Sequence, residues 1–151
     1  MKLIEKEFEK LPPRLKKKMG SFFDYDMIEK SNIIESLSQE EKEQVVPLLV
    51  SALKHRYISV RETTADLLGN IKDEKTFQTL MKLLDHSDRQ LRAGSARALY
   101  KLERKESHEK MKQKLFSDSE ADVRLHCLWA LKDELSFQDL KKVLDKDNSP
   151  R

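Results

Sequence analysis

Apolar residues recur every three to four positions along most of the chain, which is the spacing of one face of an α-helix. Short polar segments such as Asp85–Asp88 and Ser117–Glu120 separate these stretches, and their residues favour turns and helix N-caps. The pattern predicts helices at about residues 74–84, 89–104, 106–116, 120–132 and 136–146. The chain is therefore expected to be all-α.

A further helix is predicted from Ser38 to about His55. Ser38 and Glu41 have the spacing of a capping box, in which each side chain accepts a hydrogen bond from the backbone N–H of the other residue. Pro47 lies inside this helix. Because proline removes a backbone donor and crowds the preceding turn, a kink is expected near residues 43–47.

The first 37 residues follow a different pattern. Two apolar stripes are separated by Pro12-Pro13 and Gly20, and Asp26 is a possible cap for the second; they comprise Leu3, Ile4, Phe8 and Leu11, then Met27, Ile28, Ile34 and Leu37. We therefore expect an atypical helical N-terminal cap over residues 1–37, repeats over residues 38–146 and a frayed tail over residues 147–151.

An internal repeat accounts for the rest of the chain. Arg61, Arg92 and Arg124 each follow Val or Leu, at spacings of 31 and 32 residues. The segment 72–80 reappears at 132–140, 60 residues later, so the third repeat is about one helical turn shorter. Helix pairs of this length cannot bury their apolar faces alone, and stacking them gives an α-solenoid. The core is expected to include the equivalent residues Leu68, Leu99 and Leu131.

Residues 60–88 resemble the short HEAT-like repeat, of the kind also found in phycobilin lyases. The matching features are Val60-Arg61, the segment Leu68-Gly69-x-Ile71, and the leucines and aspartates that close the first helix of the next pair. The resemblance covers about residues 45–146. It implies an armadillo/HEAT-like superhelix whose second helices line a concave surface, and it leaves the function open because solenoids bind many partners.

Deoxyhypusine hydroxylase has a similar fold and binds a metal through His-Glu pairs early in its second helices. The matching positions here are Glu62-Thr63, Ala93-Gly94 and His126-Cys127, and the one His-Glu pair, His108-Glu109, falls in a first helix. The histidines also lack a metal-ligand spacing such as His-Glu-x-x-His. No catalytic residue, metal or cofactor is predicted, and the chain is expected to be non-enzymatic; the remaining alternative is an enzyme whose site is assembled across several helices.

Composition supports an elongated helical protein with a thin core. Of 151 residues, 38% are apolar and 38% are charged, and the formal net charge is only +3. No apolar run approaches the ~20 residues of a membrane span. The single cysteine, Cys127, aligns with small residues of the other repeats and is expected to be a packed thiol. A reducing, cytoplasmic location is expected.

The most charge-biased stretch is residues 89–105, with six basic residues and one acidic residue. Arg97, Lys101 and Arg104 share one helix face of it. Tyr100 and Trp129 are expected to lie beside that face, since the repeat alignment brings them together. The candidate partner-binding residues are Arg97, Tyr100, Lys101, Arg104 and Trp129.

Several interpretations of these residues stay open at this stage. The leading one is an adaptor that binds a protein or acidic peptide through its concave face. The alternative is binding of a nucleic-acid phosphate backbone along the basic stripe. The stripe is also compatible with a solvated surface, and Trp129 with the core. The three arginines at the helix starts are expected to form a ladder of Asp–Arg hydrogen bonds that caps helices between repeats.

Overall fold

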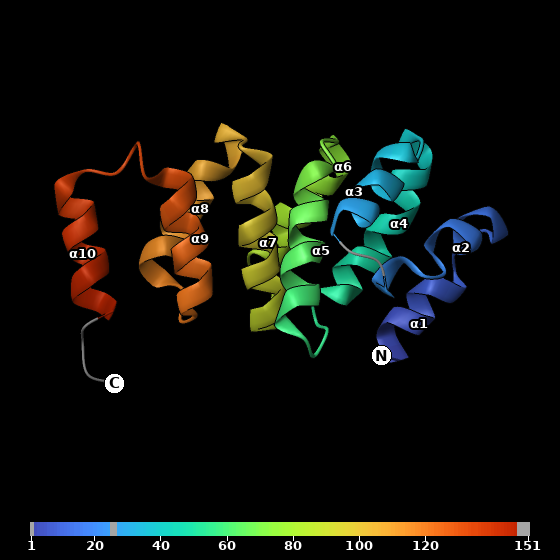
Figure 1. The fold of residues 1–151 in the computed structure, drawn as a ribbon. Helices are drawn as coiled ribbons and strands as arrows, with labels where there is room; N and C mark the ends of the chain where they lie inside the picture. Colours follow the sequence, from blue (N-terminus) through green and yellow to red (C-terminus); the bar gives the residue numbers. More distant parts are fainter. Residues whose placement is uncertain (1, 25–26, 148–151) are drawn as a thin grey trace.

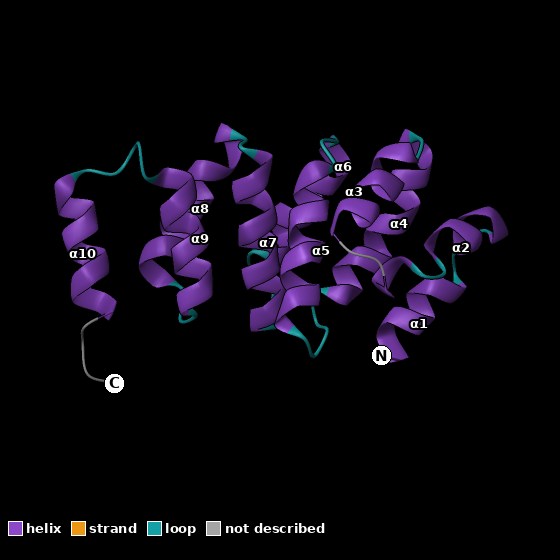
Figure 2. Ribbon diagram, viewed as in Figure 1, coloured by secondary structure: helices purple, strands orange, loops and turns teal. Residues whose placement is uncertain are grey.

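The computed structural model describes residues 2–24 and 27–147, and this part of the chain is helical without any strand (Figures 1 and 2). The all-α prediction is confirmed. The possible cap Asp26 and residues 148–151 of the tail lie outside the described residues. The α-helices are α1 (Lys2–Glu9), α2 (Pro13–Met19), α3 (Met27–Ser36), α4 (Gln39–Ala52), α5 (Ile58–Asn70), α6 (Glu74–Leu83), α7 (Arg89–Leu102), α8 (His108–Ser117), α9 (Ala121–Leu131) and α10 (Phe137–Asp147).

The helices stack in two layers, as the predicted α-solenoid requires. Helices α5, α7 and α9 lie side by side in one layer, while α4, α6 and α8 lie behind them (Figure 1). Each of α6 and α8 also packs on the second helix that follows it. Helix α9 has 11 residues where α7 has 14, which is the shortening that the repeat spacing predicts. No described helix combines the length and hydrophobicity that crossing a bilayer requires.

The core runs through the stack between the two layers. Leu68, Leu99 and Leu131 are each at most 2% exposed, so their predicted equivalence is confirmed. Cys127 is buried as well, and burial raises the pKa of its thiol to about 12, which keeps the thiol protonated. Helices α5 and α7 approach closely at Gly69, where an added Cβ would lie 2.8 Å from the Ala98 carbonyl oxygen.

The predicted capping box opens α4. The Ser38 N–H donates to the Glu41 carboxylate at 2.9 Å, and the Glu41 N–H donates to Ser38 Oγ at 3.2 Å. The helix continues across Pro47 and ends at Ala52, three residues before the expected end at His55. It ends there because residues 53–57 form a turn, in which Arg61 of the next helix binds the carbonyls of residues 55 and 56.

This turn recurs before each second helix. The side chain of one turn residue accepts a hydrogen bond from the backbone N–H two residues later. The backbone carbonyl of the same residue accepts from Nη1 of the arginine six residues later. The turn residues are His55, His86 and Asp118, and the arginines are Arg61, Arg92 and Arg124. The arginines therefore satisfy carbonyls that a turn leaves open, which explains why they recur.

The expected Asp–Arg ladder is present between the second and third repeats. Arg92 Nε and Nη2 donate to the two carboxylate oxygens of Asp118, at 2.9 and 3.1 Å. Both side chains are largely buried. Asp88 instead caps α7 and pairs with Lys54, while Asp85 pairs with Lys110 and Lys114. Successive repeats are thus joined by several kinds of ion pair.

The last helix is less deeply packed than its sequence pattern suggests. Of its four expected apolar contacts, only Val143 is buried, while Phe137, Leu140 and Leu144 are exposed. Helix α10 stands at the end of the stack (Figure 1) and packs only lightly on α8, so Val143 alone of these four side chains reaches the core.

Candidate partner-binding groove

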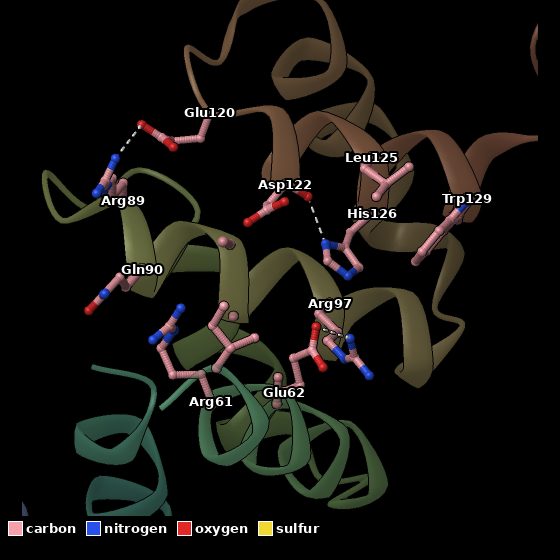
Figure 3. Close-up of a pocket in the computed structure, with 14 residues that line it drawn as sticks. Arg61, Glu62, Arg89, Gln90, Arg97, Glu120, Asp122, Leu125, His126 and Trp129 are labelled. Atoms are coloured by element: carbon pink, nitrogen blue, oxygen red, sulfur yellow. Dashed lines mark hydrogen bonds and ion pairs between the residues drawn. The ribbon is translucent and has the colours of Figure 1, made fainter. Parts of the chain in front are cut away.

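A groove of about 330 Å³ crosses α5, α7 and α9 on the face formed by the second helices (Figure 3). Small residues of α5 and α7 line it, namely Ala65, Ala93 and Gly94. Three large apolar side chains also line it, and all three are exposed: Ile58, Leu125 and Trp129. Charged and polar side chains make up the rest of the lining, so the groove is a mixed surface on which large apolar groups remain open to solvent.

The repeat itself builds this groove. The alignment of the three arginines makes Glu62, Ala93 and Leu125 equivalent, and one turn further on it makes Asp66, Arg97 and Trp129 equivalent. Because the helices lie side by side, each set forms a row across the layer. The middle helix contributes small residues to the groove. A Cβ added at Gly94 would lie 2.7 Å from the buried Leu53 side chain, so any larger residue there would force Leu53 to shift.

Arg97 lies in the groove but is not a free cation. Its Nε and Nη2 donate to the two carboxylate oxygens of Asp66 at 2.8 and 2.9 Å, and Glu62 lies 3.3 Å from Nη1. The hydrogen bonds to Asp66 raise the pKa of Arg97 above its usual value, and burial opposes them. The positive charge that the sequence suggests at this position is therefore compensated by α5.

The other two residues of the predicted stripe, Lys101 and Arg104, do not line the groove. Arg104 donates to Glu74 and Glu106 and lies 3.9 Å above the ring of Phe77, which places it against α6. Lys101 is exposed, and within the described residues no carboxylate lies within ion-pair distance of it. The basic stripe is thus largely neutralised by neighbouring helices, which a charge count along α7 alone does not reveal.

Tyr100 and Trp129 do lie together, as expected. Their ring centroids are 5.9 Å apart, and the Trp129 side chain is 42% exposed. Trp129 is therefore not a core residue. It lines the groove together with Arg97, while Tyr100, Lys101 and Arg104 do not.

His126 also lines the groove, and one of its ring nitrogens is buried without a hydrogen-bond partner. Its Nδ1 lies 2.6 Å from the Asp122 carbonyl oxygen, and since a carbonyl only accepts, Nδ1 must donate. The neutral ring then presents Nε2 as an acceptor. Nε2 is buried without a hydrogen-bond partner, and the ring packs edge-on against Trp129 at 5.2 Å (Figure 3).

Protonation of His126 should destabilise the fold. Burial lowers the pKa of His126, as does the charge of Arg97, while the Asp122 carbonyl opposes the shift. The unfolded chain therefore binds this proton more readily. The stability that neutral His126 contributes is fully present above its unfolded pKa, about 6.5, and is lost as the pH falls through the folded pKa. Wild type should lose more unfolding free energy than His126→Asn between about pH 7.5 and pH 5.5, measured by urea titration.

Asparagine is the suitable comparison because its amide can still donate to the Asp122 carbonyl but does not titrate. All other titrating groups cancel in the difference between the two proteins. Equal losses in the two proteins would contradict the lowered pKa.

Several groove residues were not among the sequence candidates. Leu125 and His126 had a usable signal, because they precede Trp129 by one turn of α9. Arg61 was identified only as a helix-capping residue, and Ile58 and Ala93 carry no pattern that separates them from ordinary helix positions. What identifies them is the equivalence of repeat positions across three helices.

Comparison with known proteins agrees with this architecture. A family model described as HEAT repeats matches residues 24–100 and again residues 46–132. The match does not single out the phycobilin-lyase type of repeat. A search of curated proteins found no match. Within the described residues, no group of three or more His, Cys, Asp or Glu side chains is placed to hold a metal ion.

Proposed function

The chain belongs to the HEAT-repeat family, whose repeats generally serve as protein-interaction scaffolds, and on this premise we propose that it is a non-enzymatic adaptor that binds a protein through the groove across α5, α7 and α9. We propose a cytoplasmic location for this activity, in keeping with a single, buried cysteine. Arg97 and Trp129 of the original candidates belong to the proposed site.

One observation carries this proposal: exposed Ile58, Leu125 and Trp129 line one depression together with the small residues Ala93 and Gly94. Large apolar side chains around a pocket are typical anchors of protein interfaces, because covering them removes much apolar area from water. The ion pair of Arg97 with Asp66 fixes a further polar group beside them. Such a surface favours a side chain or short segment of a partner over a flat contact.

Filling the groove tests the proposal. Ala93→Gln should remove partner binding, because a longer neutral side chain would occupy the floor while remaining compatible with the helix. Ala121→Gln is the matched control, since Ala121 is exposed at the start of α9 and does not line the groove. The measurement is affinity capture from the native cytoplasm with wild type and both variants. Proteins captured equally by all three would contradict binding in the groove.

Nucleic-acid binding along α7 is the alternative that the same proteins can test. Phosphate contacts give a steep dependence on salt, about −0.9 in log–log slope per contact. Because Arg97 and Arg104 are already paired with carboxylates, we expect only weak binding of a DNA duplex with a shallow slope. A steep slope that survives Ala93→Gln would favour the alternative.

A further inference from the structure

Arg61 differs from its equivalent Arg92 in how its guanidinium is used. Both arginines donate from Nη1 to the carbonyls of the preceding turn. In Arg92 the other edge, formed by Nε and Nη2, holds the carboxylate of Asp118. Arg61 makes its hydrogen bonds from Nη1 alone within the described residues, and no carboxylate there lies within ion-pair distance of it. Its second edge is therefore available.

The reason lies in the repeat alignment. The residue that corresponds to Asp118 one repeat earlier is His86. His86 keeps the role of Asp118 in the turn, since its Nδ1 accepts from the Asp88 N–H at 2.9 Å, just as Asp118 accepts from the Glu120 N–H at 3.0 Å. The neutral ring has one acceptor nitrogen, which the turn already uses, so His86 offers no acceptor to an arginine. The turn before α7 therefore has the same hydrogen bonds as the turn before α9, but it lacks the carboxylate that would pair with Arg61.

Arg61 lines the groove and is only partly buried. Figure 3 shows Arg61, Gln90 and Arg89 toward one end of the groove, with His126 and Trp129 toward the other. Arg89 is 71% exposed but pairs with Glu120 at 3.9 Å, so of these two described arginines Arg61 is the one without a carboxylate partner. This end of the groove matches an acidic group, which an arginine edge binds through two parallel hydrogen bonds.

We propose that the partner is an acidic segment whose Asp or Glu carboxylate binds the free edge of Arg61, and whose chain crosses α7 to reach His126 and Trp129. This rests on the proposed function, because it assigns a ligand class to the same groove. Packed helices lie about 8–10 Å apart, so the path from α5 to α9 is roughly 20 Å, or about six residues of extended chain.

His126 gives the other end of the path a specific requirement. Its buried Nε2 is an acceptor without a donor, and a backbone N–H of an extended segment would supply one. Trp129 and Leu125 would then cover an apolar side chain of the same segment. The predicted ligand is an extended peptide with a carboxylate at one end and a large apolar residue about six positions away.

A carboxylate placed in the chain itself should compete with this ligand. In His86→Asp, one oxygen would accept from both the Asp88 N–H and Arg61 Nη2, and the other from Arg61 Nε, as Asp118 does with the Glu120 N–H and Arg92. His86→Asn is the matched control, because it retains the turn acceptor without a charge. Arg61→Gln removes the edge directly, and its thermal unfolding shows whether loss of the turn hydrogen bonds affects folding.

The probe is a phage library of random dodecapeptides selected on the wild-type chain, with Trp129 fluorescence measuring binding of the selected peptides. We expect enrichment of Asp or Glu. The dissociation constant should rise about tenfold to a hundredfold in His86→Asp or in folded Arg61→Gln, and stay within about twofold in His86→Asn.

Selected peptides without acidic enrichment, or acidic peptides that bind all four proteins equally, would overturn the role of Arg61 while leaving the groove as a peptide site. Peptides that bind Ala93→Gln as well as wild type would instead refute the proposed function. A DNA duplex that loses affinity in His86→Asp, when peptides do not, would reassign Arg61 to phosphate and overturn the inference.

Discussion

Replacing Leu99 with alanine should lower the free energy of unfolding by about 2–5 kcal/mol. Leu99 lies on α7 in the middle of the stack and is 1% exposed. The substitution removes buried methyl groups and leaves a cavity that close-packed neighbours fill only in part. Because domains of this size are stable by only about 5–15 kcal/mol, the loss would be visible in both thermal and urea unfolding.

Leu144→Ala is the matched control for this prediction. Leu144 lies on α10 and is 61% exposed, so the same chemical change removes little buried area, and an effect within about 0.5 kcal/mol is expected. Leu68→Ala should resemble Leu99→Ala, since Leu68 is equivalent and fully buried. Equal melting of Leu99→Ala and wild type would show that the repeat register is wrong.

Replacing Asp118 with alanine should cost about 3–5 kcal/mol, because it leaves the largely buried Arg92 guanidinium without its carboxylate. The Asp118 side chain is 3% exposed and also accepts from the Glu120 N–H. The substitution therefore removes both an ion pair between repeats and a turn hydrogen bond. The measurement is urea unfolding of wild type and variant at neutral pH.

Acid should reproduce part of this loss. Burial alone would raise the pKa of Asp118, but the hydrogen bonds from Arg92 and the Glu120 N–H outweigh it and lower the pKa. A carboxyl with a lowered folded pKa contributes stability that is present above its unfolded pKa, near 4, and is lost as the pH falls through the folded pKa. The difference between wild type and Asp118→Ala should therefore shrink in acid.

Asp85→Ala provides the comparison for Asp118→Ala. Asp85 pairs with Lys110 and Lys114, but its side chain is 59% exposed, so water screens these pairs. We expect a cost of at most about 1 kcal/mol. If both variants lost the same free energy, burial would not be what makes the Arg92–Asp118 pair strong.

Much of the fold could be predicted from the sequence because the same pattern of buried positions occurs in three successive repeats. Leu68, Leu99 and Leu131 occupy the same repeat position and are all buried. An error in the repeat register would have predicted the wrong burial for all three. Helix ends were less predictable. Arg61 binds carbonyls that would otherwise continue α4, and Glu103 adopts a left-handed conformation (φ 55°) that ends α7 at Leu102. Both depend on contacts or backbone geometry that hydrophobic periodicity does not contain.

The site was only partly predictable, and the reason is physical. Arg97 and Asp66 are 31 residues apart in the sequence yet occupy the same repeat position, so the stack places them side by side and they pair. A charge count within α7 treats Arg97 as free. Comparing equivalent positions of adjacent repeats would have predicted the pair. No sequence pattern predicts that Nε2 of His126 has no hydrogen-bond partner, because this depends on which donors lie around it in the folded structure.

The two-layer stack also affects the folding rate of the chain. Its extensive helix–helix contacts join elements no more than three helices apart in the described order, such as α5 with α7 and α1 with α4. Closing short loops costs little chain entropy, and proteins dominated by local contacts fold in microseconds to milliseconds. Each pair can therefore dock on its neighbour soon after both have formed, without waiting for the distant end of the polypeptide.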